Sequence, residues 1–358
     1  MIPGQDATML SHSHQVSIIA HRGASALRPE HTLAAYAKAI EDGADAIEPD
    51  LVSTQDGFLV ARHENEISGT TDIADHSEFA PRKTRKSIDG EKIDGWFTED
   101  FTLAELRTLR ARERLPQLRS TAYDGQFGIV TLDEIIELVA SESSKHGRVI
   151  GIVPEIKHPT YFAALGLAME DKLLATLMAH AYTQNAPVII QSFEITNLRY
   201  LRDKIEATYA NIELLQLLGE KDGRPYDAIV SRQRTTYAEM MRPSGLREIA
   251  SYADAIGASI KNVDLRSSAQ EARSVLVDDA HAEGLKVVVY TFRPENHFLS
   301  SEFKDGGGAA ERNEFGSVRE MQRYIAAGID AIFTDDPALG REAVAQASGA
   351  RHIHSPGE

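Results

Sequence analysis

Three acidic residues have the types and the spacing of a site for a hard cation. Glu48 and Asp50 lie two residues apart in one apolar run, so on a strand their side chains point to the same face. Glu155 ends a second such run. Carboxylates that point together repel unless they are protonated, paired or neutralised, and three of them suit Mg²⁺ or Ca²⁺. The alternative is a structural ion-pair network with Arg22 and Lys157.

Two histidines fall just past predicted strands. His21 follows the apolar run 16–20, and His63 follows the short run 58–61. Imidazole can accept or donate a proton near neutral pH, so a histidine pair beside an acidic cluster favours general acid and base catalysis. The alternative is that one of them is an ordinary packed or surface histidine, as we expect for most of the 13 in the chain.

Arg22 and Lys157 are candidates for holding an anion. The guanidinium of Arg22 can grip a phosphate or a carboxylate with two hydrogen bonds, whereas Lys157 acts as a point charge. Salt bridges to the neighbouring acidic residues do not exclude this role, because the same groups can do both.

The elements that must position these residues alternate between strands and helices. Apolar runs predict strands at 16–20, 46–52, 149–156, 188–191, 213–218, 255–260, 286–290 and 331–334, with 58–61 as an extension of the second unit. Helical periodicity predicts helices at 32–42, 131–141, 161–181, 194–204, 244–253, 270–283 and 317–327. Eight such units indicate an α/β fold with a closed parallel barrel, whose strands carry their functional residues at the carboxyl ends.

Residues 66–119 interrupt this alternation. Charged and turn-forming residues dominate there, with one short helix expected near 102–110. We predict an N-terminal tail at 1–15, a barrel domain at 16–342 with an insertion at about 66–119, and a C-terminal tail at 343–358. A polar loop is expected at 219–243.

Composition restricts the functions that the chain can have. A net charge of −16 argues against binding to nucleic acid, and the absence of cysteine excludes disulfides, thiolate catalysis and cysteine-based zinc sites. We find no signal peptide and no membrane-spanning segment in the sequence. The expected location is therefore cytoplasmic, or periplasmic if a leader has been removed.

Five separated motifs occur together in the order of a known family. They are His21-Arg22-Gly23-Ala24-Ser25, Pro29-Glu30-His31-Thr32, Glu48-x-Asp50, His63 and Glu155-Ile156-Lys157, with further likeness at Thr71–Asp75, Gln191-Ser192-Phe193, Tyr290–Arg293 and Phe333–Asp335. This combination resembles the glycerophosphodiester phosphodiesterases, and most of all their longer bacterial, periplasmic-type branch. The likeness extends over roughly residues 18–339. One departure is Glu64, where the family usually has Asp after the histidine.

The resemblance implies a TIM (β/α)8 barrel with a small inserted subdomain after the second strand. It implies one divalent cation held by Glu48, Asp50 and Glu155, with Ca²⁺ favoured over Mg²⁺. His21 and His63 would be the acid/base pair.

The same resemblance implies the residues that bind substrate and the reaction. Arg22 and Lys157 would contact phosphate, and we expect Gln191 and Tyr290 to contact the substrate as well. The implied reaction is hydrolysis of glycerophosphodiesters to sn-glycerol 3-phosphate and an alcohol. The expected partner is a small substrate, with no nucleic acid and no stable membrane insertion.

Two other functions use the same site. A lysophospholipase D or sphingomyelinase D-like enzyme would need an apolar channel for an acyl chain, and the polar insertion favours small water-soluble diesters instead. A non-catalytic barrel that only binds polyol phosphates would have lost a ligand or a histidine, and all five of these residues are present.

Overall fold

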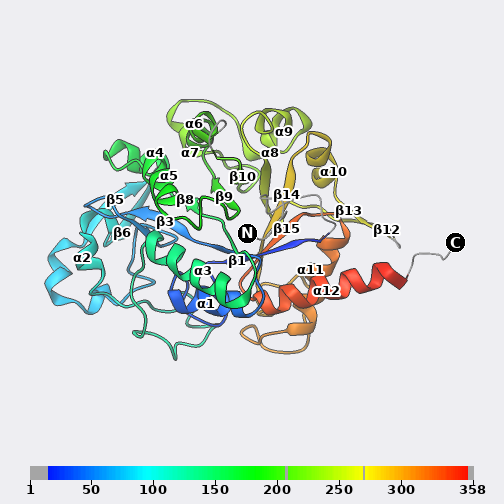
Figure 1. Cartoon of the computed structure of the whole chain (residues 1–358), viewed down its shortest axis with the longest axis horizontal. Helices are drawn as coiled ribbons and strands as arrows, with labels where there is room; N and C mark the ends of the chain where they lie inside the picture. Colours follow the sequence, from blue (N-terminus) through cyan, green and yellow to red (C-terminus); the bar gives the residue numbers. More distant parts are fainter. Residues whose placement is uncertain (1–14, 206–208, 269–270, 354–358) are drawn as a thin grey trace.

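A closed parallel β-barrel organises the computed structural model, which describes residues 15–205, 209–268 and 271–353 (Figure 1). Its eight strand positions in the described chain are β1 (Ser17–His21), β2 with β3 (Ala46–Glu48, Asp50–Ser53), β7 with β8 (Gly151–Ile152, Glu155–Ile156), β9 (Val188–Ser192), β10 (Ile212–Leu218), β11 (Ala255–Ser259), β14 (Lys286–Phe292) and β15 (Ala331–Thr334). β15 pairs with β1, and β9 pairs with β10, so the sheet closes. The predicted barrel is confirmed.

Two of the barrel strands are interrupted at a proline. Pro49 separates β2 from β3, and Pro154 lies between β7 and β8. Proline has no N–H to give to a ladder, but its carbonyl still accepts: the Glu155 N–H donates to the Pro49 oxygen at 2.9 Å. β4 (Leu59–Ala61) returns antiparallel to β3, so it extends the second unit without entering the barrel.

Helices cover the outside of the barrel. They are α1 (Leu33–Glu41), α3 (Leu132–His146), α4 (Pro159–Ala164), α5 (Glu170–Ala179), α6 (Ile195–Ile205), α9 (Pro243–Ile249), α10 (Val275–Ala282), α11 (Glu314–Ala326) and α12 (Pro337–Ile353). Their starts follow capping chemistry, since the Thr32 hydroxyl accepts from the Ala35 N–H and Thr131 forms a capping box with Glu134.

Several helix predictions differ from the structure. The single helix expected at 161–181 is two helices, α4 and α5, because Gly166 takes a left-handed φ of +74° between them. The loop expected at 219–243 contains two short helices, α7 (Tyr226–Val230) and α8 (Tyr237–Met240). The helix expected at 270–283 begins only at Val275, as α10. It is preceded by a hairpin of β12 (Arg266–Ser268) and β13 (Glu271–Arg273). Residue 270 lies outside the described residues. α12 continues into the segment 343–358 as far as Ile353.

The chain between β4 and α3 is compact and irregular. It contains η1 (Ile73–Asp75), η2 (Ser77–Arg82), the hairpin β5–β6 (Thr84–Ile88, Glu91–Gly95), η3 (Thr98–Asp100) and α2 (Leu103–Leu106). Trp96, Phe97 and Phe101 are buried and pack this segment. Figure 1 shows this segment at the left-hand end of the molecule, where β5, β6 and α2 are labelled.

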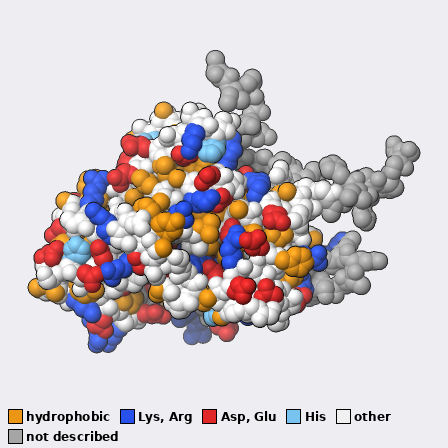
Figure 2. Space-filling model, turned by 90° about the horizontal axis from the view of Figure 1, so that it is seen from below, with side chains coloured by type: hydrophobic (Ala, Val, Ile, Leu, Met, Phe, Trp, Pro, Cys, Tyr) orange, Lys and Arg blue, Asp and Glu red, His pale blue; other side chains and the backbone are white. Residues whose placement is uncertain are grey.

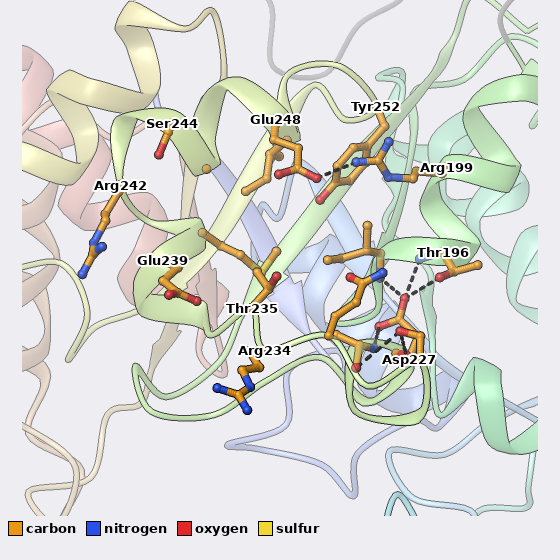
Figure 3. A pocket seen from close by; sticks show the side chains of 17 residues that line it. Thr196, Arg199, Asp227, Arg234, Thr235, Glu239, Arg242, Ser244, Glu248 and Tyr252 are labelled. Carbon is orange, nitrogen blue, oxygen red and sulfur yellow. Dashed lines mark hydrogen bonds and ion pairs between the residues drawn. The ribbon is translucent and has the colours of Figure 1, made fainter.

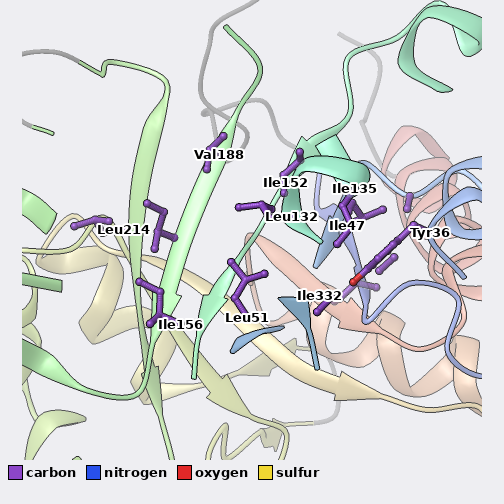
Figure 4. Close-up of a cluster of buried hydrophobic side chains, with 14 of the residues drawn as sticks. Tyr36, Ile47, Leu51, Leu132, Ile135, Ile152, Ile156, Val188, Leu214 and Ile332 are labelled. Atoms are coloured by element: carbon purple, nitrogen blue, oxygen red, sulfur yellow. The ribbon is translucent and has the colours of Figure 1, made fainter. Parts of the chain in front are cut away.

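The apolar core has two layers. Inside the barrel, alternate strand residues pack together: Ile19, Ala46, Val153, Ile189, Leu215, Leu217, Ala255, Val288, Ala331 and Phe333. The larger layer lies between the barrel and its helices, where Tyr36, Ile47, Leu132 and Ile135 meet (Figure 4). Because side chains alternate along a strand, the residues two positions beyond the inner layer also face the barrel axis. They form the upper end of the barrel.

Acidic, basic and hydrophobic side chains are mixed on the face of the molecule shown in Figure 2. Within the described ranges, no helix combines the length and the apolarity needed to cross a membrane.

Gly23 turns the chain directly after β1, and its conformation gives a first prediction. Its φ is +90°, and a Cβ there would lie 2.7 Å from the carbonyl carbon of Ala35 in α1. Gly23→Ala should lower the free energy of unfolding by at least about 2 kcal/mol, from backbone strain plus overpacking. Chemical denaturation measures this.

Gly125→Ala is the matched control, since Gly125 has a φ of +77° but nothing within 4 Å of the added carbon. It should cost only about 1 kcal/mol. Equal losses in the two variants would contradict the close approach of Gly23 to α1.

Candidate active site

Strand register brings five of the predicted residues into two neighbouring rows at the carboxyl ends of the barrel strands. His21 on β1 stands opposite Glu48 on β2, Asp50 on β3 opposite Glu155 on β8, and Glu155 opposite Gln191 on β9. Four of them lie two residues after a residue of the inner apolar layer on the same strand position. The fifth, Asp50, lies two residues after Glu48. The carboxyl ends of four neighbouring strand positions thus converge on one point.

Glu48, Asp50 and Glu155 form a buried carboxylate cluster. One oxygen from each lies within 4.8 Å of the others, and the three residues are 2%, 1% and 6% exposed. Glu48 accepts hydrogen bonds from the Arg22 N–H at 2.8 Å and from Gln191 Nε2 at 3.1 Å. The Oδ1 atom of Asp50 is buried and has no hydrogen-bond partner.

The charges of the cluster are only partly balanced. Burial, followed by the charges of Asp50 and Glu155, raises the pKa of Glu48 well above its usual value. Burial also raises the pKa of Glu155 to about 8 although Lys157 opposes it. Burial acts in the same sense on Asp50, but Lys157 and the nearby histidines hold its pKa well below the usual value.

This donor set fits a hard divalent cation. Three carboxylates provide only oxygen ligands, one of their oxygens lacks a partner, and two of the three acids resist ionisation. The structural alternative is also realised in part, because Lys157 Nζ lies 2.8 Å from Glu155 and Arg22 Nε lies 3.3 Å from Asp50. Those pairs leave Asp50 Oδ1 without a hydrogen bond, as expected of an oxygen that could bind a cation.

His21 is held through one ring nitrogen. Its Nδ1 lies 2.7 Å from Asp335 Oδ1, and its ring packs edge-on against Phe333. Burial and then the charge of Arg22 lower the pKa of His21 to about 4, against the opposing effect of Asp335. The imidazole is therefore neutral at pH 7, with Nε2 available for proton transfer if Nδ1 carries the hydrogen.

His63 is arranged in the same way. It follows β4, and its Nδ1 makes a short contact with Glu64, the residue at which the sequence departs from the family pattern. Burial, then Arg22 and Lys157, lower the pKa of His63 to about 3. Both histidines thus have Nδ1 against a carboxylate.

The two predicted cations lie within the same site. Arg22 has a left-handed φ of 59°, and its Nη1 donates to Glu30 at 3.1 Å. Lys157 is 6% exposed, with Nζ 3.9 Å from Asp50 Oδ1 and 5.8 Å from the centre of the Phe193 ring.

Tyr290 stands apart from this group. Its hydroxyl donates to the Leu218 carbonyl at 2.8 Å, and its ring meets Phe193 edge-on. Its hydroxyl is thus engaged within the barrel, and its ring adjoins the Phe193 ring that Lys157 approaches.

Several residues that hold the site together were not among the predicted site residues. His31 is fully buried, with Nε2 2.9 Å from Asp50 Oδ2 and Nδ1 2.8 Å from the Tyr36 hydroxyl. Asp335 lies two residues past Phe333, and that strand-end position is the signal that could have identified its role. Arg114 and Arg119 come from an irregular segment, where no periodicity marks them.

Of the cavities lined by described residues, two bear on the position of the site. One of about 240 Å³ adjoins the carboxylate cluster and is lined by Glu155, Lys157, Phe193, Glu194 and Tyr237, together with Asp89, Ile156, His158, Pro159, Ser192, Arg224, Tyr226 and Ile229. It leaves room beside the cluster for part of a small polar ligand.

The other cavity, of about 640 Å³, lies among α6, α7, α8 and α9 (Figure 3). There Asp227 accepts hydrogen bonds from the Thr196 N–H and hydroxyl, and Arg199 pairs with Glu248. No residue of the carboxylate cluster is among the described residues that line it. We therefore assign no part of the chemistry to this cavity.

Comparison with known proteins agrees with this geometry. The model of the glycerophosphoryl diester phosphodiesterase family matches residues 21–339. The chain is 35% identical to a glycerophosphodiester phosphodiesterase of Arabidopsis thaliana over 88% of this chain and 82% of that protein. It is 27% identical to a glycerophosphodiester phosphodiesterase of Haemophilus influenzae over 91% of this chain and 88% of the relative.

The fold is also similar to that of a solved Oleispira antarctica phosphodiesterase in complex with the product sn-glycerol 3-phosphate. The TM-score is 0.57 and the sequences are 20% identical, over 95% of this chain and all of the other. At this identity the likeness concerns the fold.

The lowered pKa of His21 predicts how stability depends on pH. Between pH 6.5 and about 4 the unfolded chain binds a proton at this residue that the folded protein does not. Stability should therefore fall as the pH is lowered through this window. Measured by denaturation with a chelator present, wild type should lose about 2 kcal/mol more than His21→Gln between pH 7 and pH 5.

His180→Gln is the control, because His180 is a partly exposed residue at the end of α5 that pairs with Asp133. It should follow the wild-type profile. A His21→Gln profile parallel to wild type would show that His21 is not held neutral.

Proposed function

The chain belongs to the glycerophosphoryl diester phosphodiesterase family, and we propose that it hydrolyses glycerophosphodiesters to sn-glycerol 3-phosphate and an alcohol. The observation that carries the proposal is the convergence of a three-carboxylate cluster, two histidines and two cations at the carboxyl ends of the barrel strands. The sn-glycerol 3-phosphate bound to the Oleispira antarctica phosphodiesterase supports this substrate class.

The family depends on a divalent metal, and we propose that Glu48, Asp50 and Glu155 hold it. When bound, such an ion neutralises a phosphodiester anion and stabilises the charge that develops on its oxygens. We favour Ca²⁺ over Mg²⁺, because Ca²⁺ accepts more ligands with looser geometry and because of the likeness to the longer bacterial branch.

Arg22 and Lys157 are proposed to bind the phosphate. Arg22 Nε is buried and makes no hydrogen bond, although it lies 3.3 Å from Asp50 Oδ2, which supports a donor that a phosphate oxygen could accept from. Lys157 approaches from β8, on the other side of Asp50, so the two cations flank the cluster. Gln191 and Tyr290 are proposed to contact the substrate, Gln191 from beside Glu48 and Tyr290 through its ring.

His21 and His63 are proposed as the acid/base pair. One imidazole accepts the proton of the attacking hydroxyl, and the other gives a proton to the alcohol oxygen as its bond to phosphorus breaks. Both rings keep Nδ1 against a carboxylate, which supports Nε2 as the nitrogen that exchanges the proton. A substrate phosphate beside the rings would favour their charged form and oppose the effect of burial.

The segment 66–119 is proposed to act as an inserted subdomain that completes the site. Arg114 and Arg119, at its C-terminal end, reach Glu30, Glu64 and Asp335. The barrel and the insertion therefore both contribute to the surroundings of the histidines.

A lysophospholipase D or sphingomyelinase D-like activity is the alternative on the same site. The cavity beside the cluster carries the charged residues Asp89, Glu194 and Arg224 besides its aromatic side chains, which favours a polar alcohol over an acyl chain. Hydrolysis of glycerophosphocholine should exceed that of lysophosphatidylcholine; the reverse preference would decide for the alternative.

Replacement of either histidine tests the catalytic assignment. His21→Ala and His63→Ala should each lower kcat for glycerophosphocholine by at least about 100-fold, since each removes a positioned acid or base. Release of sn-glycerol 3-phosphate in a coupled assay gives the rate.

His180→Ala should retain the wild-type rate and provides the control. If either His21→Ala or His63→Ala kept full turnover, that residue would have no catalytic role.

Removal of the ion tests the carboxylate cluster. Exhaustive chelation should abolish hydrolysis, and added Ca²⁺ should restore it more fully than Mg²⁺. Asp50→Asn should weaken this restoration by at least about 10-fold in the Ca²⁺ concentration required, because it removes one anionic ligand. Full activity in the chelated enzyme would rule out the metal site.

A further inference from the structure

Two arginines of the insertion lie behind the carboxylates that touch the two histidines. We infer that Arg114 and Arg119 are positioning residues, which orient His63 and His21 through Glu64 and Asp335. The inference rests on the proposed function, because it requires these histidines to be the acid/base pair. It goes beyond that function in giving the insertion a part in the reaction.

Arg119 controls Asp335 from a buried position. Its Nη2 donates to Asp335 Oδ2 at 2.6 Å, while Asp335 Oδ1 lies 2.7 Å from His21 Nδ1. The same guanidinium donates from Nε and Nη2 to Glu295, at 2.6 and 3.2 Å, and from Nη1 to the carbonyl of Ser25 at 3.0 Å. With its side chain only 6% exposed, Arg119 is a rigid support.

Arg114 does the same for Glu64. It donates to the two Glu64 oxygens at 3.1 and 2.7 Å, and Glu64 contacts His63 Nδ1. It also holds Glu30 at 2.8 and 2.7 Å, and Glu30 accepts a hydrogen bond from Arg22. Arg114 therefore reaches both His63 and the arginine proposed to bind phosphate.

The two series of contacts, Arg119–Asp335–His21 and Arg114–Glu64–His63, have the same order of arginine, carboxylate and imidazole. A carboxylate fixed by a guanidinium accepts a hydrogen from Nδ1, so it selects the tautomer in which Nε2 is free for proton transfer. Lysine would keep the charge but not the planar fork that holds both partners at once. The loss of geometry can thus be tested separately from the loss of charge.

The two series of contacts differ in whether the arginine is also connected to a residue proposed to bind substrate, and a kinetic experiment can detect this difference. Within the described part of the chain, Arg119 donates to Asp335, to Glu295 and to the Ser25 carbonyl, and none of these is proposed to bind substrate. Arg114 is joined to Arg22 through Glu30. Arg119 should therefore affect kcat alone, whereas Arg114 should affect both kcat and KM.

A double-mutant cycle tests the inference with glycerophosphocholine as substrate. Arg119→Lys should lower kcat by about 10- to 100-fold, as expected for a displaced catalytic group, and leave KM within about threefold. In the Asp335→Asn background, the same change should alter kcat by less than about threefold, because the path through Asp335 is already broken. Arg114→Lys should lower kcat and raise KM.

Arg85→Lys is the matched control. Arg85 makes two hydrogen bonds to Asp94 within the same insertion, at 2.8 and 2.6 Å, on its exposed β5–β6 hairpin. It should leave both kinetic constants unchanged. Additive losses for Arg119→Lys and Asp335→Asn, or wild-type kcat in Arg119→Lys, would overturn the inference for Arg119.

A second measurement does not depend on the variants folding. Long-range ¹H–¹⁵N spectra of the wild-type enzyme should show His21 and His63 with hydrogen on Nδ1 and a bare Nε2. The opposite tautomer would overturn the inference even if every variant proved unstable. If the wild-type enzyme released no sn-glycerol 3-phosphate from glycerophosphodiesters, the proposed function would fail, and if His21→Ala kept full turnover, the acid/base assignment of His21 would fail. Both results differ from the opposite tautomer in an active enzyme, so the failures are distinguishable.

Discussion

The mutual repulsion of three buried carboxylates is the constraint on which the rest of the site depends. Because their oxygens lie within 4.8 Å of one another, each pair would repel by roughly 3 kcal/mol or more if both members were ionised, in a medium of intermediate dielectric. The fold places this cluster where four neighbouring strand positions end. The cluster is surrounded by donors that each pair with one of its carboxylates: Arg22, Lys157, His31 and Gln191. Asp50 Oδ1 still makes no hydrogen bond.

Around the cluster, the molecule divides its tasks between two parts. Regular strands bring the carboxylates and His21 together, because parallel register sets their level without any loop. The irregular insertion, in contrast, supplies the arginines that hold the carboxylate partners of the histidines. Without the insertion, Glu64 and Asp335 would lack these arginines, and their carboxylates could rotate. The arginines hold the carboxylates and thereby fix the orientation of the imidazoles.

Period-two patterning explains how much of this could be predicted. Glu48, Asp50 and Glu155 stand out because charged residues in apolar strands need a reason, whereas the eight-unit barrel follows from the alternation of apolar strand runs with helical segments. The break between α4 and α5 depends on Gly166, whose left-handed conformation overrides a continuous helical pattern. Arg114 and Arg119 could not be found in this way, because their roles come from contacts between segments far apart in sequence, such as Arg119 with Asp335.

Unfolding temperature, with and without Ca²⁺, tests most directly whether the cluster is built for a cation. In chelator at pH 7, Glu155→Gln should unfold at a temperature higher than wild type by roughly 3 °C or more, because an amide removes the cost of burying an acid that must be either protonated or repelled by its neighbours, and it still accepts from Lys157. Added Ca²⁺ should raise the unfolding temperature of wild type and have little effect on the variant. A wild-type protein indifferent to divalent cations, or a variant that kept the full Ca²⁺ response, would contradict this account of the site.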